Sequence, residues 1–125
     1  MTHAANNVVM IVEDDVDTQE ALAEILEQSG YRAVTAGNGR EALDHLRGTR
    51  QPRPCLIILD VMMPVMDGWQ FRAEQRKDPE LAAIPVIFVT ADLDAQGAVA
   101  ERGGAAFIPK PVQLNKLLEA VRAAC

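Results

Sequence analysis

The sequence has little positive charge, few cysteines and no long apolar run. Twelve Lys and Arg residues stand against eighteen Asp and Glu residues, which gives a net charge of −6. Nucleic acid and anionic membrane surfaces bind clustered Lys and Arg, so we expect neither as a direct partner. No apolar run is long enough to span a bilayer, and the polar residues 1–7 do not resemble a signal peptide. We therefore expect a cytoplasmic protein.

The two cysteines, Cys55 and Cys125, do not form a zinc-binding pattern. Cys55 falls in an apolar run and is expected to act as a small buried hydrophobic residue. Cys125 is the last residue, so we expect no disulfide between the two. A chain of 125 residues is long enough for a hydrophobic core without such a bridge. We expect one domain over residues 1–125, with an ordered core over about residues 7–124.

Short apolar runs alternate with segments of helical periodicity along the chain. The runs are Val8–Val12, Tyr31–Ala36, Cys55–Asp60, Ile84–Thr90 and Ala105–Ile108. The helical pattern is weakest over Asp92–Arg102, where Gly97 costs about 1 kcal/mol relative to Ala. The polar stretch Arg72–Lys77 leaves its helix only a narrow buried face. Strands alternating with helices predict an α/β fold, with a parallel sheet covered by helices on both faces.

Polar residues stand where these runs end. Glu13 and Asp14 follow the first run, Asp60 ends the central one, and Thr90 and Lys110 end or follow the last two. The carboxyl ends of parallel strands meet at one edge of a sheet. Crowded carboxylates raise each other's pKa unless a cation lies among them, and Mg²⁺ with a bound phosphate meets that need. A carboxylate beside Mg²⁺ and phosphate-binding Thr and Lys groups is able to attack phosphorus, which makes Asp60 the candidate nucleophile.

Several segments resemble the response-regulator receiver domains of two-component signalling, and together they cover essentially the whole chain. They occur in order and at suitable spacing, as Val12–Asp15, Asn38–Leu43, Asp60–Gly68, Ile84–Ala91 and Phe107–Pro111. The loop Asp60–Gly68 is the most specific of them. The resemblance implies a flavodoxin-like fold, which is a doubly wound five-stranded parallel sheet in the order 2-1-3-4-5 with five helices.

The resemblance also implies a role for individual residues. Asp60 would be the phosphoacceptor. Asp14 would bind Mg²⁺ directly, with Mn²⁺ possible in its place, and Glu13 would bind it directly or through water. The backbone carbonyl of Met62 would be a further ligand. The apolar side chain of Met62 would not orient a water for hydrolysis, so we expect autodephosphorylation that is not especially fast.

A second group would respond to phosphorylation. Thr90 would bind a phosphoryl oxygen, Lys110 would pair with the phosphoryl group, and Phe107 would change rotamer when Thr90 moves. The Lys110–Pro111 peptide bond would be cis. The surface that switches would be formed by the fourth helix, fifth strand and fifth helix. Ala105 and Ala106 stand where the family commonly has acids, which predicts a less polar signalling face.

By this resemblance the protein is a signalling switch and not an enzyme that turns over a substrate pool. Its phosphodonor would be a sensor histidine kinase, a histidine phosphotransfer protein or a small phosphodonor. Its output would be a downstream protein target. It would be a monomer or a weak phosphorylation-dependent dimer. Whether it stands alone or is a receiver fragment of a larger regulator or hybrid kinase stays open.

Two other classes of function are alternatives to a phosphorylated switch. Phosphatase-like hydrolases with an Asp nucleophile typically carry a second acid two residues later, where this chain has Met62. A receiver-like interaction module that is not phosphorylated would not need the set Asp14, Asp60, Thr90 and Lys110.

Some of the same residue types have simpler explanations. Asp15 and Asp17 are expected to cap the first helix, and Asp67-Gly68 to be a cap followed by a flexible residue. Met63 and Trp69 are expected to serve packing, and His3 and His45 to be exposed.

Overall fold

The computed structural model describes residues 7–48, 53–91, 97 and 106–125. Over these residues, parallel strands form one sheet in the order β2-β1-β3-β4-β5. The strands are β1 Val8–Val12, β2 Arg32–Ala36, β3 Leu56–Asp60, β4 Val86–Thr90 and β5 Ala106–Pro109. The helices are α1 Val16–Gln28, α2 Gly39–Gly48, α3 Gly68–Lys77 and α5 Leu114–Ala124. The predicted α/β fold and strand order are confirmed; apart from Gly97, the helix expected over 92–102 lies outside the described residues.

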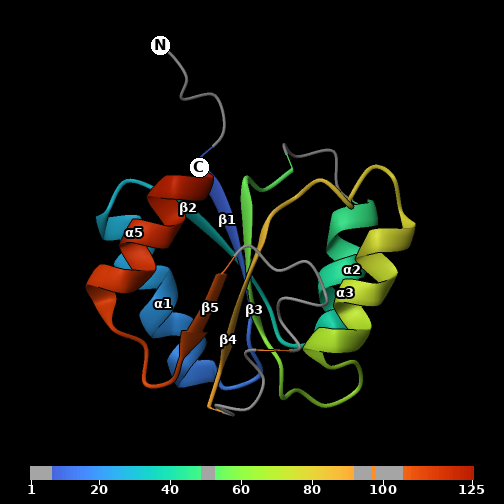
Figure 1. Cartoon of the computed structure of the whole chain (residues 1–125), viewed down its shortest axis with the longest axis horizontal. Coiled ribbons are helices and arrows are strands. Elements are labelled where there is room, and N and C mark those ends of the chain that lie inside the picture. Colours follow the sequence, from blue (N-terminus) through green and yellow to red (C-terminus); the bar gives the residue numbers. More distant parts are fainter. Residues whose placement is uncertain (1–6, 49–52, 92–96, 98–105) are drawn as a thin grey trace.

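The helices cover both faces of the sheet. Figure 1 shows α1 and α5 on one side and α2 and α3 on the other. Every residue of β1, β3 and β4 is buried, because these inner strands have helices on both sides. This burial explains why the three strands appear in the sequence as unbroken apolar runs instead of alternating ones.

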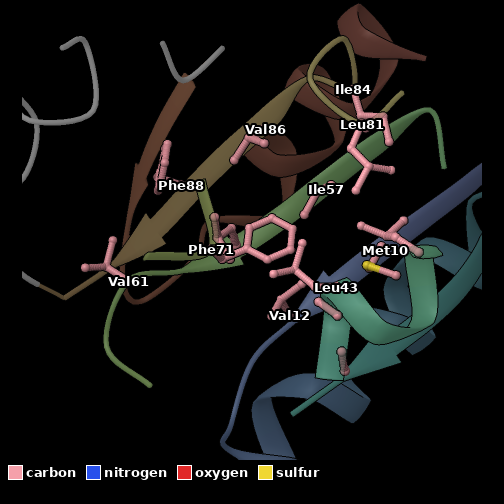
Figure 2. Close-up of a cluster of buried hydrophobic side chains, with 14 residues drawn as sticks. Met10, Val12, Leu43, Ile57, Val61, Phe71, Leu81, Ile84, Val86 and Phe88 are labelled. Atoms are coloured by element: carbon pink, nitrogen blue, oxygen red, sulfur yellow. The ribbon is translucent and has the colours of Figure 1, made fainter. Parts of the chain in front are cut away.

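Two hydrophobic clusters fill the spaces between the sheet and its helices. The first lies under α2 and α3 and includes Leu43, Ile57 and Phe71. Figure 2 shows Phe71 among side chains from the sheet, with Leu43 of α2 nearby. The second lies under α1 and α5 and includes Leu26 and Leu117. Of the described helices, none has the length and apolar character of a membrane span.

The buried face of α3 is completed by polar side chains. Phe71 is the large apolar side chain of α3 that is fully buried, and the half-buried Trp69 packs against the first cluster. They are joined by the buried Arg72 and Gln75. The Nε2 of Gln75 donates hydrogen bonds to the carbonyl oxygens of Leu81 (2.9 Å) and Ile84 (3.0 Å). Its Oε1 accepts one from Arg72 at 2.6 Å. Gln75 therefore joins α3 to the segment that leads into β4.

The expectation that Cys55 and Cys125 remain unpaired is wrong. They form a disulfide with Cα atoms 5.5 Å apart, across a sequence separation of 70 residues. Cys55 precedes β3 and so lies at the amino edge of the sheet. Helix α5 runs back from the carboxyl edge, which returns Cys125 to the amino edge. The position of Cys125 at the end of the sequence therefore did not mean that it lies far from Cys55 in the fold.

Candidate functional site

Carboxylates from two neighbouring strands meet at the carboxyl edge of the sheet. Glu13 and Asp14 follow β1, and Asp60 is the last residue of β3. One carboxylate oxygen from each of the three lies within 4.8 Å of the others. Glu13 and Asp60 are only 2% and 5% exposed, whereas Asp14 is exposed to solvent. The cluster is therefore an open-sided acidic pocket.

Lys110 brings a positive charge into this pocket from the end of β5. Its Nζ lies 2.7 Å from Oε1 of Glu13 and 3.4 Å from Oδ2 of Asp60. Its backbone N–H donates to the carbonyl of Thr90 at 2.9 Å, which joins the ends of β5 and β4. The Lys110–Pro111 peptide bond is cis, as expected. Lys110 thus contacts Glu13, which is 97 positions away in the sequence, and Asp60, which is 50 positions away.

The charges of the pocket do not balance. Burial raises the pKa of Glu13, and the neighbouring Asp60 raises it further, while Lys110 lowers it in part. Desolvation and Glu13 raise the pKa of Asp14. Burial alone would lower the pKa of Lys110, but the hydrogen bond to Glu13 and the charge of Asp60 raise it. Among the described residues, three carboxylates thus share one ammonium group, and a cation would relieve the remaining repulsion.

The other predicted site residues lie around the pocket. Thr90 is fully buried at the end of β4, the strand beside β3. Phe107 is half-buried on β5, where it is in register with Phe88 of β4 and packs against the first cluster. Met62 is 68% exposed, and its backbone N–H donates to Oδ1 of Asp60 at 3.3 Å. Asp92, which follows β4 closely, lies outside the described residues.

The loop after Asp60 is held by close contact at Gly68. A Cβ on Gly68 would lie 2.5 Å from the carbonyl oxygen of Asp60, and its N–H donates to Val61 at 3.0 Å. Asp67 caps α3 in a reciprocal capping box with Gln70, as predicted for its cap role. Gly68 is thus needed for a close approach of two backbone segments and not, as expected, for flexibility.

A second contact holds the same loop from α2. The N–H of Gly39 donates to the carbonyl of Met66 at 3.0 Å, and a Cβ on Gly39 would lie 2.7 Å from Cγ of Met66. Val65, between these anchored parts, has φ 68° and is 80% exposed. A β-branched residue in the left-handed region is a backbone outlier. The loop conformation is therefore imposed by its surroundings.

The acidic residues that follow β1 have different roles. Asp15 caps α1 by accepting from the N–H of Thr18 at 3.1 Å, while Asp17 lies in the first turn. The Nε2 of Gln19 donates to the carbonyls of Glu13 (3.0 Å) and Ala36 (3.2 Å). Through these two hydrogen bonds, Gln19 joins the backbone at Glu13 to the end of β2. Gln19 was not predicted as a site residue, because in the sequence it is only a polar residue early in a helix.

Fold and site together define a doubly wound α/β domain with an acidic pocket at the carboxyl edge of its sheet. The family profile described as the response regulator receiver domain matches residues 9–122. The chain therefore belongs to the response regulator receiver family, whose members are signalling switches.

The comparisons with individual proteins agree. The polar-differentiation response regulator DivK of Brucella anthropi is 34% identical over 116 residues, which cover 91% of this chain and 92% of that protein. The crystal structure of a response regulator receiver protein from Pseudomonas putida is 36% identical, with a TM-score of 0.87 and coverage of 97% and 99%. The Thermotoga maritima response regulator TrrA, solved in complex with Mg²⁺-BeF, is 27% identical, with a TM-score of 0.83 and coverage of 95% and 99%.

Proposed function

We propose that the chain stores a phosphoryl group on Asp60 and thereby acts as a phosphorylation-dependent switch. The observation that carries the proposal is the contact of Lys110 with both Asp60 and Glu13 inside a cluster of carboxylates. An oxygen of Asp60 attacks the phosphorus of a phosphohistidine, the P–N bond breaks, and the phosphoryl group remains on Asp60. Lys110, already 3.4 Å from Asp60, then pairs with a phosphoryl oxygen.

The pocket suits a hard divalent cation. Glu13, Asp14 and Asp60 offer oxygen ligands within one small cluster, and Met62 would add its backbone carbonyl. Bound Mg²⁺ would offset the repulsion between the anionic Asp60 and an anionic phosphodonor. Desolvation first, and then a neighbouring carboxyl group, raise the pKa values of Glu13 and Asp14, and a bound cation would act against both effects. Mn²⁺ has the same ligand preference and would fit the same oxygens.

Exposed apolar side chains lie at the same edge of the sheet as the acidic pocket. Val16, Met62, Val65 and Leu114 are each at least half exposed, and all follow strand ends or begin helices near them. Such a rim suits a protein donor, which is either a sensor histidine kinase or a histidine phosphotransfer protein. Because these donors act in the cytoplasm, we place the receiver there.

Phosphorylation is transmitted through Thr90 and Phe107. Thr90 binds a phosphoryl oxygen, Phe107 follows it, and the face made by the fourth helix, β5 and α5 changes. Ala106 and Phe107 make this face less polar, so contacts with the downstream target rely on apolar packing. The claim of apolar packing would be contradicted if charge reversal on α5 of this chain abolished target binding while apolar-to-polar changes on β5 did not.

Met62 bears on the lifetime of the phosphoryl group. Its exposed thioether has no strong donor or acceptor with which to orient an attacking water. Autodephosphorylation is therefore not especially fast. Met62→Asn is expected to shorten the phosphate lifetime, and an unchanged or longer lifetime would contradict this role.

The decisive experiment is labelling with acetyl phosphate and Mg²⁺, followed by intact mass. Wild type is expected to gain one phosphoryl group, Asp60→Asn none, and the exposed-acid control Asp44→Asn as much as wild type. Chelation of Mg²⁺ is expected to abolish labelling. A folded wild type that takes up no phosphoryl group would instead support a receiver-like module that is not phosphorylated. Catalytic release of phosphate in excess over protein would support a hydrolase.

A further inference from the structure

Helix α5 is fastened at both ends to the same strand. Just before α5, Lys110 contacts Asp60 at the carboxyl end of β3, with an Nζ–Oδ2 distance of 3.4 Å. Just after α5, Cys125 is bonded to Cys55, the residue before β3. One attachment is ionic and lies in the phosphorylation pocket. The other is covalent and lies at the opposite edge of the sheet.

The fold does not depend on the covalent attachment. Between the two ends, Leu117 and Val121 are fully buried in the second cluster, which already holds α5 against the sheet. The N–H of Cys125 donates to Val121 at 2.9 Å, and that of Cys55 donates to Val8 at 2.8 Å. Both cysteines are thus positioned by their backbones, so the sulfur atoms remain neighbours whether or not they are bonded.

Exposure gives the two sulfur-bearing residues different access to solvent. Cys125 is exposed, whereas Cys55 is half-buried. Bonds between accessible cysteines in compartments rich in reducing thiols are usually transient and often redox-sensing. An exposed first cysteine beside a less accessible second one is the arrangement that such chemistry requires.

We propose that Cys55 and Cys125 form a reversible redox modification site, through which hydroperoxides or small disulfides control the attachment of the end of α5. The Cys125 thiolate attacks a hydroperoxide, an S–O bond forms as the O–O bond breaks, and water or an alcohol leaves. The Cys55 thiolate then attacks the Cys125 sulfur and expels the oxygen as water. In total two thiols lose two electrons and two protons, which reduce the peroxide. Small thiols reverse the step by exchange and are oxidised to their disulfide.

The modification has a local structural consequence. Ala120, Ala123 and Ala124 of α5 form one wall of a shallow apolar groove whose other wall contains Pro85 and Ala106. In the disulfide the last turn of α5 is fixed beside this groove. In the dithiol that turn is held by its helical hydrogen bonds and by the packing of Val121 and Ala124 in the second cluster. Reduction therefore loosens the last turn without breaking the core.

The test uses the full chain in glutathione buffers of graded redox ratio, with free thiols counted by alkylation and intact mass. Wild type is expected to pass between two free thiols and none, as a monomer, while Cys125→Ser keeps one. Hydrogen exchange in the last turn of α5 is expected to speed up severalfold on reduction of wild type and not to respond in Cys125→Ser. The readout is independent of phosphorylation, so it stands or falls separately from the function of Asp60.

Three results would overturn the proposal. One is a wild type that keeps two free thiols even after treatment with hydrogen peroxide. Another is a bridge that the native protein retains in excess dithiothreitol, which would make it a permanent structural bond. The third is oxidation that yields disulfide-linked dimers. Cys55→Ala supplies a second variant, since it leaves Cys125 in place without its partner.

Discussion

Gly68 sets the geometry of the loop after Asp60 because it has no side chain. Its missing Cβ would lie 2.5 Å from the Asp60 carbonyl oxygen and 2.9 Å from Cα of Val61. Both are backbone atoms, so neither is able to turn aside as a flexible side chain would. Any side chain here would push the start of α3 away from the residue that carries the chemistry.

We therefore expect Gly68→Ala to lower the free energy of unfolding by about 1–3 kcal/mol, because an added methyl overpacks a close contact. The matched control is Gly48→Ala in α2, where a Cβ would meet nothing within 4 Å. That variant is expected to be neutral, or more stable by up to about 1 kcal/mol. Urea unfolding of both variants makes the comparison; equal effects would remove the close-contact explanation.

Asp14 provides a prediction about charge. Its pKa is raised by desolvation and by Glu13, so the folded chain holds this proton more firmly than the unfolded chain does. A raised carboxyl pKa destabilises the fold above that pKa, and the penalty disappears as the pH falls through it. In metal-free buffer at neutral pH, Asp14→Asn is expected to be more stable than wild type by about 0.2–1 kcal/mol, since solvent screens an exposed carboxylate.

The stability difference between Asp14→Asn and wild type is expected to shrink as the pH approaches 3.8, the ordinary pKa of Asp. Added Mg²⁺ is expected to reverse its sign by stabilising wild type more. Thermal unfolding across pH, with and without a chelator, measures both effects. Glu20→Gln on the exposed face of α1 is the control. If the stability difference between Asp14→Asn and wild type grew as the pH fell, the raised pKa of Asp14 would not be its cause.

Single residues also mark the limits of sequence reasoning. The positions of Glu13, Asp60, Thr90 and Lys110 at strand ends were predictable, because a parallel sheet brings such ends together. The pairing of Cys55 with Cys125 was not, because it depends on the length of α5 relative to β3. The role of Gly68 was also hidden, since a glycine letter does not distinguish a flexible site from a crowded one.

At the scale of elements, α3 shows how a mostly polar helix is held in place. Its sequence offers one large buried apolar side chain, Phe71, and its attachment to the following segment comes from Gln75. The amide fills the space between α3 and the carbonyls of Leu81 and Ile84. The helical periodicity of apolar residues gives no sign of an attachment made by a polar side chain. The sequence therefore predicted the helix but not the role of Gln75.

Gln75→Leu is expected to destabilise the protein by about 2–4 kcal/mol, because it removes the buried hydrogen bonds to the carbonyls of Leu81 and Ile84 and a partner of Arg72. Gln28→Leu is the matched control, since the side-chain amide of Gln28 is exposed and bonds Glu24 on the same helix. Its effect is expected to stay within about 0.5 kcal/mol. Chemical denaturation of the two variants measures the difference, and similar small losses in both would show that the buried amide contributes little.

At the scale of the whole molecule, the sheet separates two clusters that share no helix. Ile57 and Ile84 lie in the cluster under α2 and α3, and Ile108 lies in the one under α1 and α5. The alternation of strands and helices along the chain was enough to predict this layering. It could not say which helix residues complete each cluster, since that depends on how each helix is rotated against the sheet.

Each Ile→Val change in these clusters is expected to cost about 0.5–1.5 kcal/mol. Ile84→Val and Ile108→Val, on opposite faces, are expected to add within about 0.5 kcal/mol. Ile57→Val and Ile84→Val, which share a cluster in Figure 2, are expected to depart further from additivity. A double-mutant cycle on each pair, measured by denaturant unfolding, tests whether substitutions on opposite faces of the sheet act independently. A large coupling energy between Ile84→Val and Ile108→Val would show that they do not.

The position of Cys125 has a practical use. It lies at the amino edge of the sheet, while Asp60 lies at the carboxyl edge, so the end of the chain and the reactive carboxylate point in opposite directions. Figure 1 shows that end beside the start of β1. A biosensor chip, fluorescent protein or affinity handle attached after Cys125 would therefore leave the carboxyl edge of the sheet, with the proposed phosphoacceptor Asp60, accessible. Binding measured on such a surface would report on the unobstructed acidic cluster.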